Sequence, residues 1–130
     1  MFLDKAEELT SKGYCIENAR IQEVRLTFED HGVLTLDLVL EGRDWGCCFG
    51  GYVLGHGYIG AKEFSGSANG IEAIMRVMDT IGVHDLLKAK GMYVRAAFKR
   101  PGSQPVEYIG NVIQDKWFGY KEFFEGKEEK

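Results

Sequence analysis

Residues 24–40 read VRLTFEDHGVLTLDLVL, and this pattern sets the architecture of the chain. Apolar residues occupy every second position in residues 24–28 and again in residues 34–40, as in two half-buried β-strands. Between them, residues 29–32 (EDHG) have turn chemistry. The stretch therefore predicts a long antiparallel hairpin, whose first strand begins near residue 16.

The rest of the chain predicts an α+β fold around this hairpin. We expect a single antiparallel sheet of about five strands, with one main helix packed on a face and short terminal helices. Residues 1–130 would form a single domain, with residues 1–13 as a helical extension and residues 126–130 as a frayed tail. The other expected elements are a helix at 2–12, a third strand at 46–54, a mobile glycine-rich loop at 55–70, a helix at 71–81, a helical turn at 84–88, strands at 92–100 and 106–113 joined by a hairpin loop at 101–105, and a short helix at 115–124.

The main helix has clear signals at both ends. Ser67 or Asn69 can cap its start, and Gly82 can end it. Apolar residues at helical spacing predict the face that packs on the sheet. That expected face consists of Ile71, Ile74, Met75, Met78 and Ile81.

Composition and charge exclude several classes of protein. Hydrophobic residues make up 45% and charged residues 28%, a globular balance that needs no disulfide or structural metal at 130 residues. The net charge of −4 argues against non-specific DNA binding. We expect a cytoplasmic protein, because no apolar run reaches the roughly 20 residues of a membrane span and the N-terminus does not resemble a signal peptide. The cysteines are expected to be buried, reduced thiols: Cys15, Cys47 and Cys48.

Common catalytic and metal-binding motifs are missing. The chain has no GxxxxGK[ST] phosphate loop, no GxGxxG after a strand, no HExxH and no GxSxG. His31, His56 and His84 are far apart and lack an i, i+4 partner for a metal. We therefore nominate no catalytic residue, no metal ligand and no cofactor, and expect a binding protein rather than an enzyme.

A cluster of glycines and aromatics lies in the expected third strand. Phe49 and Tyr52 flank Gly50 and Gly51, although glycine weakens a strand interior. Aromatic faces can stack on nucleobases, and backbone N–H groups of glycines can bind phosphate. The same residues also fit a simpler interpretation, in which the aromatics belong to the core and the glycines form a bulge.

Two arginines lie on the expected outer faces of their strands. If the strands that carry Arg25 and Arg95 are neighbours, both guanidinium groups could line one surface and bind phosphate in a bidentate manner. Exposed arginines more often serve solubility alone, so this alternative stays open.

The end of the last expected strand gathers side chains of mixed chemistry. Asn111, Asp115, Lys116 and Trp117 supply an amide, a carboxylate, an ammonium and an indole within a short segment. This mixture suits the edge of a ligand site or an interface. A lid that closes the core is an equally good interpretation.

Five segments together resemble a family of small phage proteins. They are residues 16–21 (IENARI), 30–35 (DHGVLT), 49–52 (FGGY), 109–111 (IGN) and 115–118 (DKWF). As a set they resemble the Thoeris anti-defence 1 family over residues 16–118. The helix at 2–12 and the loop at 101–105 lie outside the shared pattern.

The resemblance implies a protein that sequesters a cyclic signalling nucleotide without cleaving it. The ligands it implies are cyclic ADP-ribose isomers made by bacterial TIR proteins, and for some members also cyclic oligonucleotides. It further implies oligomers with pockets between subunits.

Residues and resemblance together give a leading hypothesis. The protein binds a cyclic nucleotide immune signal in the infected bacterial host, as a homo-oligomer (dimer or hexamer) with no DNA and no membrane partner. The alternative is a phage inhibitor that contacts a host defence enzyme directly, of the anti-restriction or anti-CRISPR type, because acidic charge suits mimicry of nucleic acid. An enzyme that degrades the nucleotide is a third hypothesis. In the leading hypothesis, the base stacks on Phe49, Tyr52 or Trp117. The phosphates contact Arg25, Arg95 and Lys116. Asn111 and Asp115 form hydrogen bonds with the base or the ribose.

Overall fold

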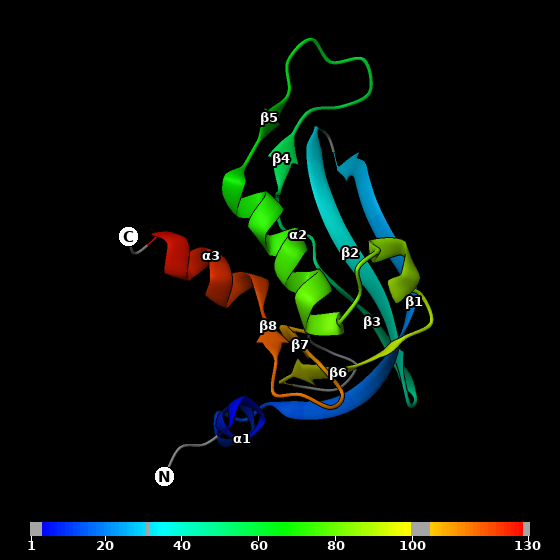
Figure 1. The fold of residues 1–130 in the computed structure, drawn as a ribbon, viewed down its shortest axis with the longest axis vertical. Helices are drawn as coiled ribbons and strands as arrows, with labels where there is room; N and C mark the ends of the chain where they lie inside the picture. The colour runs from blue at the N-terminus through cyan, green and yellow to red at the C-terminus, as the bar shows by residue number, and fades with distance from the viewer. Residues whose placement is uncertain (1–3, 31, 100–104, 129–130) are drawn as a thin grey trace.

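The predicted hairpin forms the centre of the fold. The computed structural model describes residues 4–30, 32–99 and 105–128. Strand β1 (Cys15–Asp30) pairs antiparallel with β2 (Val33–Gly42), and the pair runs along the right-hand side of the view in Figure 1. The alternating pattern of residues 24–40 therefore predicted this pairing correctly.

One curled antiparallel sheet contains all the strands that the structure describes. Its order is β5-β4-β2-β1-β6-β7-β8, and β3 pairs with the same edge of β2 as β4 does. The α+β class with a single sheet is confirmed. The sheet has eight strands in the described residues rather than about five, because short strands that the sequence pattern does not reveal extend it. The bounds are β3 Trp45–Phe49, β4 Gly55–His56, β5 Ser65–Gly66, β6 Tyr93–Phe98, β7 Tyr108–Gly110 and β8 Trp117–Phe118.

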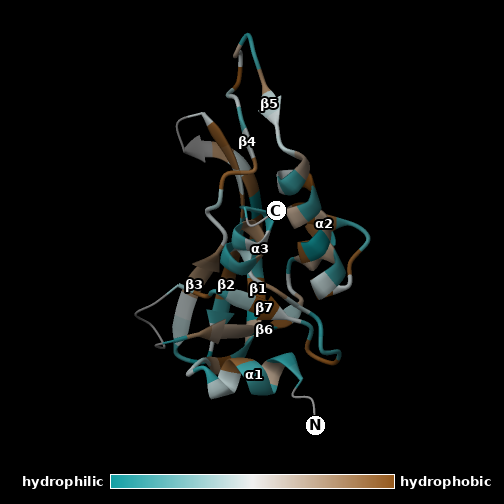
Figure 2. Ribbon diagram, turned by 90° about the vertical axis from the view of Figure 1, so that its left-hand side faces the viewer, coloured by the Kyte–Doolittle hydropathy of each residue, from teal (hydrophilic) through white to brown (hydrophobic). Residues whose placement is uncertain are grey.

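Helices cover one side and one end of this sheet. The main helix α2 runs along the β1–β2 pair, with α3 near it on the same side and α1 at the end of the molecule opposite β4 and β5 (Figures 1 and 2). Within the described residues, no helix combines the length and apolar character needed to cross a membrane. The bounds are α1 Lys5–Ser11, α2 Ala68–Ile81, the 3₁₀ turn η1 Leu86–Ala89 and α3 Tyr120–Glu128.

Both ends of α2 follow the predicted capping chemistry. Of the two candidate caps, Ser67 is the one used, since its hydroxyl oxygen accepts a hydrogen bond from the N–H of Gly70 at 3.1 Å. Gly82 ends the helix in the left-handed conformation, with φ 91°. The stop of this helix was therefore correctly predicted from local sequence, and the first of the two candidate caps is used, so the helix begins at Ala68 rather than at residue 71.

The buried face of α2 differs from the predicted one. Ala73 and Val77 are fully buried, whereas Ile71 and Met75 are exposed. At Gly70 the helix approaches the backbone of Leu54 so closely that a Cβ would collide with its carbonyl oxygen. Small residues therefore face the sheet where the helix lies close to it, and Ile71 and Met75 turn outward. Of the predicted face, Ile81 is buried and Ile74 packs against the core.

The core lies between α2, the sheet and the start of α3. Leu36, Leu38 and Leu40 of β2 are buried, as the alternation predicted. Val94 and Phe98 of β6 join them in the same cluster. This core fixes the segments that carry most of the predicted site residues.

Several strands and helices begin or end at other residues than the sequence predicts. The strand expected at 46–54 ends at Phe49, because Gly50 (φ +146°) turns the chain away from β2. The strand expected at 106–113 is only β7, and the helix expected at 115–124 starts at Tyr120 and reaches Glu128. Residues 126–128 are therefore helical rather than frayed. The start of the helix expected at 2–12, His31, most of the loop at 101–105 and residues 129–130 lie outside the described residues.

The expected burial of the cysteines is wrong for two of the three. Cys15 and Cys48 are exposed, and Cys47 is half-buried. Cys48 precedes the buried Phe49 on β3, so strand alternation places its side chain on the opposite, outer face.

The position of Gly50 yields a first prediction. A Cβ at Gly50 would collide with the carbonyl oxygen of Leu36, and its φ of +146° also disfavours any side chain. We expect Gly50→Ala to lower the free energy of unfolding by about 2–4 kcal/mol, through strain and overpacking together. Gly60→Ala is the matched control, because Gly60 also has a positive φ but open space around it. Urea denaturation of both variants measures the difference, and equal losses would contradict the role assigned to Gly50.

Candidate functional site

The connection between β7 and β8 brings five of the predicted site residues together. Arg95 reaches it from β6: its Nε donates to the carbonyl oxygen of Asn111 at 2.8 Å, and a terminal nitrogen donates to that of Gln114 at 3.0 Å. The Arg95 guanidinium also lies 4.5 Å from the centroid of the Trp117 ring. Arg95 therefore holds the connection in place, with these donors used inside the protein.

Asn111 ties this connection to the end of α2. Its amide nitrogen donates to the carbonyl oxygens of Thr80 at 3.0 Å and Ile81 at 3.4 Å. Its amide oxygen accepts the N–H groups of Ile113 and Gln114, each at 2.9 Å. Carbonyls at a helix C-terminus lack partners within the helix, so Asn111 satisfies them and orders the loop at once.

Asp115 joins the connection to the N-terminal helix. Its carboxylate accepts the backbone N–H of Lys5 at 3.0 and 3.2 Å, and the indole N–H of Trp117 at 2.8 Å. These hydrogen bonds, that of the Lys5 backbone foremost, hold the pKa of Asp115 below its usual range because they stabilise the ionised form. Asp115 thus fixes both α1 and the indole of Trp117.

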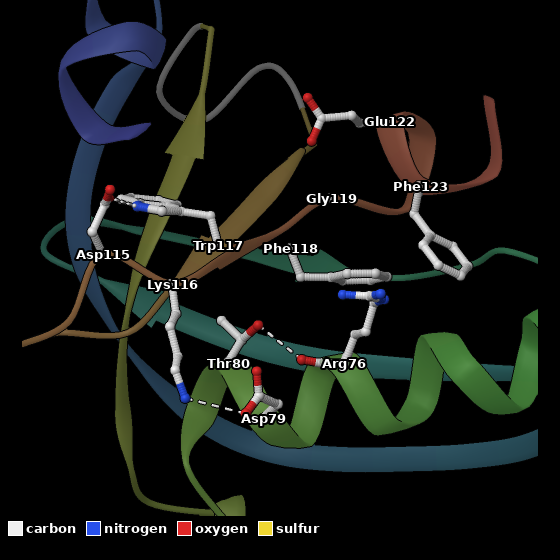
Figure 3. Close-up of a pocket in the computed structure, with 10 residues that line it drawn as sticks. All are labelled: Arg76, Asp79, Thr80, Asp115, Lys116, Trp117, Phe118, Gly119, Glu122 and Phe123. Atoms are coloured by element: carbon white, nitrogen blue, oxygen red, sulfur yellow. Dashed lines mark hydrogen bonds and ion pairs between the residues drawn. The ribbon is translucent and has the colours of Figure 1, made fainter. Parts of the chain in front are cut away.

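A hollow of about 360 Å³ lies next to this connection, between the C-terminal half of α2 and the start of α3 (Figure 3). Three predicted site residues line it, namely Asp115, Lys116 and Trp117. Its size suits a small-molecule ligand. The complete lining is Arg76, Asp79, Thr80, Asp115, Lys116, Trp117, Phe118, Gly119, Glu122 and Phe123.

Each of the two cations of the hollow forms an ion pair in which at least one partner is exposed. Lys116 Nζ lies 3.1 Å from Asp79 Oδ1, and Arg76 Nε lies 2.7 Å from Glu72 Oε2. The Arg76 and Lys116 side chains are 58% and 44% exposed. Exposed pairs of this kind contribute little to stability, so a phosphate could compete for both cations at small cost.

A second hollow, of about 330 Å³, is lined by part of the glycine–aromatic cluster. Phe49, Gly50 and Tyr52 line it, together with Tyr120 and Lys121 of α3. Successive residues of α3 therefore face different hollows, because Glu122 and Phe123 line the first. The predicted site is thus divided between two hollows.

Phe49 is a core residue, which is the simpler interpretation left open by the sequence. Its ring is 2% exposed and contacts the rings of Phe118 and Tyr120. Tyr52 is more accessible and stacks on Tyr120, with ring centroids 5.2 Å apart and planes within 12°. Gly51, at φ +84°, follows Gly50 outside the strand. Of the predicted stacking residues in this cluster, only Tyr52 offers an exposed ring.

The arginines of β1 and β6 do not converge. The two strands are neighbours, but Arg95 pairs with Asn18 whereas Arg25 pairs with Asp37, seven residues farther along β1. At about 3.3 Å per residue, this places them roughly 23 Å apart. Neither belongs to the described lining of the two hollows.

The sequence interpretation missed residues that tertiary packing brings to the hollow. Asp79 and Thr80 follow Arg76 at i+3 and i+4 on α2, and Glu122 and Phe123 come from the start of α3. A charged side of α2 next to its C-terminal glycine was the signal available in the sequence. It does not reveal which loop lies opposite.

Comparison with known proteins adds no relative. No family model, curated protein or solved structure matches this chain. In the part of the chain that the structure describes, no group of three or more His, Cys, Asp or Glu side chains could hold a metal ion. The chemistry of the hollow therefore follows from its own side chains.

The hydrogen bonds of Asp115 yield a prediction of pH dependence. Because the folded-state pKa of Asp115 lies below its ordinary value of about 3.9, its stabilisation is complete above that pH and is lost as the pH falls through the folded-state pKa. We therefore expect the wild-type protein to be more stable than Asp115→Asn at pH 7, and this difference to shrink below about pH 4. Thermal denaturation of both proteins at pH 7 and at several pH values below about 4 measures it. A difference that does not change with pH would show that the charge of Asp115 is irrelevant.

Proposed function

We propose that the protein binds and sequesters an anionic cyclic nucleotide of the cyclic ADP-ribose type, without cleaving it. The observation that carries this proposal is the pair of partly exposed cations, Arg76 and Lys116, at one hollow of about 360 Å³. The volume of the hollow lies in the range of small-molecule sites. The partly exposed side chains of Arg76 and Lys116 can exchange their carboxylate partners for phosphate oxygens.

The other polar groups of the hollow suit the sugar rather than the phosphates. Asp79, Asp115 and Glu122 line it with carboxylates, which accept hydrogen bonds from ribose hydroxyls. Three carboxylates beside two cations disfavour a small bare anion. We therefore expect a nucleotide to bind more tightly than inorganic phosphate or pyrophosphate.

Two aromatic side chains complete the match to a nucleotide. Trp117 and Phe123 line the hollow from opposite ends of the segment that joins β8 to α3 (Figure 3). Each ring has a cation near one face, because Arg95 lies over Trp117 and Arg76 lies 5.8 Å from the centroid of Phe123. A base can stack on aromatic or guanidinium planes of this kind.

The resemblance of residues 16–118 to the Thoeris anti-defence 1 family supports the same proposal. It supplies the setting, in which a phage protein removes the cyclic nucleotide that would activate a host defence effector. It also supports a homo-oligomer, a dimer or hexamer with sites between subunits. The hollow is open to solvent in one chain, so a second subunit could close it.

Arg76 provides the direct test of this proposal. We expect Arg76→Ala to weaken binding of a cyclic ADP-ribose isomer about tenfold or more, because a charge-assisted contact to phosphate is lost. The matched control is Arg43→Ala, which removes an exposed arginine from the turn between β2 and β3. Titration calorimetry gives the affinities, and mass spectrometry of the ligand recovered after denaturation shows whether it is intact.

Three results would overturn the proposal. They are absence of binding by the wild-type protein to every cyclic nucleotide tested, equal losses in Arg76→Ala and Arg43→Ala, and recovery of a cleaved ligand. Cleavage would favour the nucleotide-degrading enzyme instead.

A second function is supported by a different surface. Tyr58, Ile59 and Phe64 are exposed in the segment between β4 and β5, and Ile59 is 88% exposed. Neighbouring exposed apolar side chains mark protein interfaces. If the protein inhibits a host defence enzyme by direct contact, Ile59→Asp should abolish a stoichiometric complex with that enzyme while Arg76→Ala leaves it intact. Gel filtration of the mixed proteins distinguishes the two functions.

A further inference from the structure

Lys5 connects two walls of the hollow through two different groups. Its backbone N–H donates to the Asp115 carboxylate, at 3.0 and 3.2 Å from the two oxygens. Its ammonium lies 3.0 Å from Glu122 Oε1 on α3. Asp115 and Glu122 both line the hollow, but Lys5 itself belongs to α1 and is not part of the described lining.

We propose that Lys5 is a positioning residue of the nucleotide site, an inference that rests on the function proposed above. Through its N–H and its ammonium, Lys5 holds Asp115 and Glu122 in place and offsets their negative charge. It thereby lets an anion approach Arg76 and Lys116.

The charges around the hollow show why this offset matters. The lining contains two cations, Arg76 and Lys116, and three carboxylates, so it carries one net negative charge. The ammonium of Lys5, which it shares with Glu8 outside the hollow, lies beside Glu122 and offsets part of this negative charge. Removing it takes away the cation beside Glu122, so this carboxylate repels an anionic ligand across the hollow more strongly.

The setting of Lys5 fits a charged, held side chain. Its side chain is 23% exposed, and it bonds Glu8 as well as Glu122, each at 3.0 Å. Burial by itself lowers the pKa of Lys5, but the hydrogen bonds and charges of Glu122 and Glu8 outweigh it, so the pKa is raised. Its ammonium also lies 5.4 Å from the centroid of the Tyr108 ring. Lys5 therefore stays protonated between these partners.

The position of Lys5 in α1 allows its ammonium contact to be removed either alone or together with its N–H contact. Lys5 is the first residue of the helix and follows the cap Asp4, whose backbone is extended at φ −74° and ψ 170°. Proline is well accepted at this first position, and an extended residue is what proline requires before it. Lys5→Pro thus removes both N–H and ammonium while keeping the helix, whereas Lys5→Met removes the ammonium alone.

Affinity tests the role of the ammonium. We expect Lys5→Met to weaken binding of a cyclic ADP-ribose isomer about tenfold at low ionic strength, and much less in about 0.5 M NaCl, where the charge is screened. Lys5→Arg keeps the charge and should bind within about threefold of the wild-type protein. Lys12→Met is the matched control, because Lys12 caps the other end of the same helix and its ammonium contacts Glu8, which is not part of the lining of the hollow.

A ligand-independent signal tests the role of the N–H. The indole N–H of Trp117 donates to the same carboxylate, so its NMR resonance reports how Asp115 is held. We expect Lys5→Pro to shift this resonance, and Lys5→Met and Lys12→Met to leave it in place. A Trp45→Phe variant assigns the signal, since Trp45 and Trp117 are the two tryptophans of the chain.

These measurements separate failure of the inference from failure of the proposed function. If the wild-type protein binds no nucleotide, the proposed function is wrong, and the Lys5→Pro spectrum still decides whether Lys5 positions Asp115. An unshifted resonance in Lys5→Pro overturns the positioning role. So does an affinity loss in Lys5→Met that Lys12→Met reproduces or that salt does not reduce.

Discussion

The antiparallel pairing of β1 with β2 is the constraint on which every other element depends. β1 also pairs with β6, and β2 carries both β3 and β4 on its other edge. Between β3 and β4 the backbone passes close to the carbonyl oxygen of Leu36. A residue with a Cβ would collide with this oxygen, so the chain has glycine at position 50. The core leucines of β2 then define where α2 packs, and the end of α2 defines where the connection between β7 and β8 is anchored.

The candidate site is built on side chains that hold the protein together. The Arg95 guanidinium and the Asn111 amide donate to backbone carbonyls, and Asp115 accepts from α1 and from an indole. These contacts order the wall of the hollow before any ligand arrives, so binding need not order it at further entropic cost. The groups left to meet a ligand in the proposed function are Arg76 and Lys116, whose side chains are 58% and 44% exposed.

Features set by neighbouring residues in the chain could be predicted from the sequence, whereas the close approach of α2 to the backbone beneath it could not. The hairpin, the cap Ser67 and the stop Gly82 followed from alternation and capping rules, which act between near neighbours. The outward turn of Ile71 and Met75 depends on the backbone of Leu54, a contact that no periodicity contains. The clustering of residues 111–117 was visible because they adjoin in sequence, but their pairing with Arg76 and Asp79 across the hollow arises only from the packing of α2.

The double use of the connection between β7 and β8 has an evolutionary consequence. Substitutions at Asn111 or Arg95 would disturb the fold and the site together, so selection for a new ligand has little freedom there. Arg76 and Asp79 stand on the outer side of a helix whose buried face is formed by other residues. If the proposed function is correct, changes in ligand preference are therefore expected to accumulate on α2, while Asn111 and Arg95 stay nearly constant.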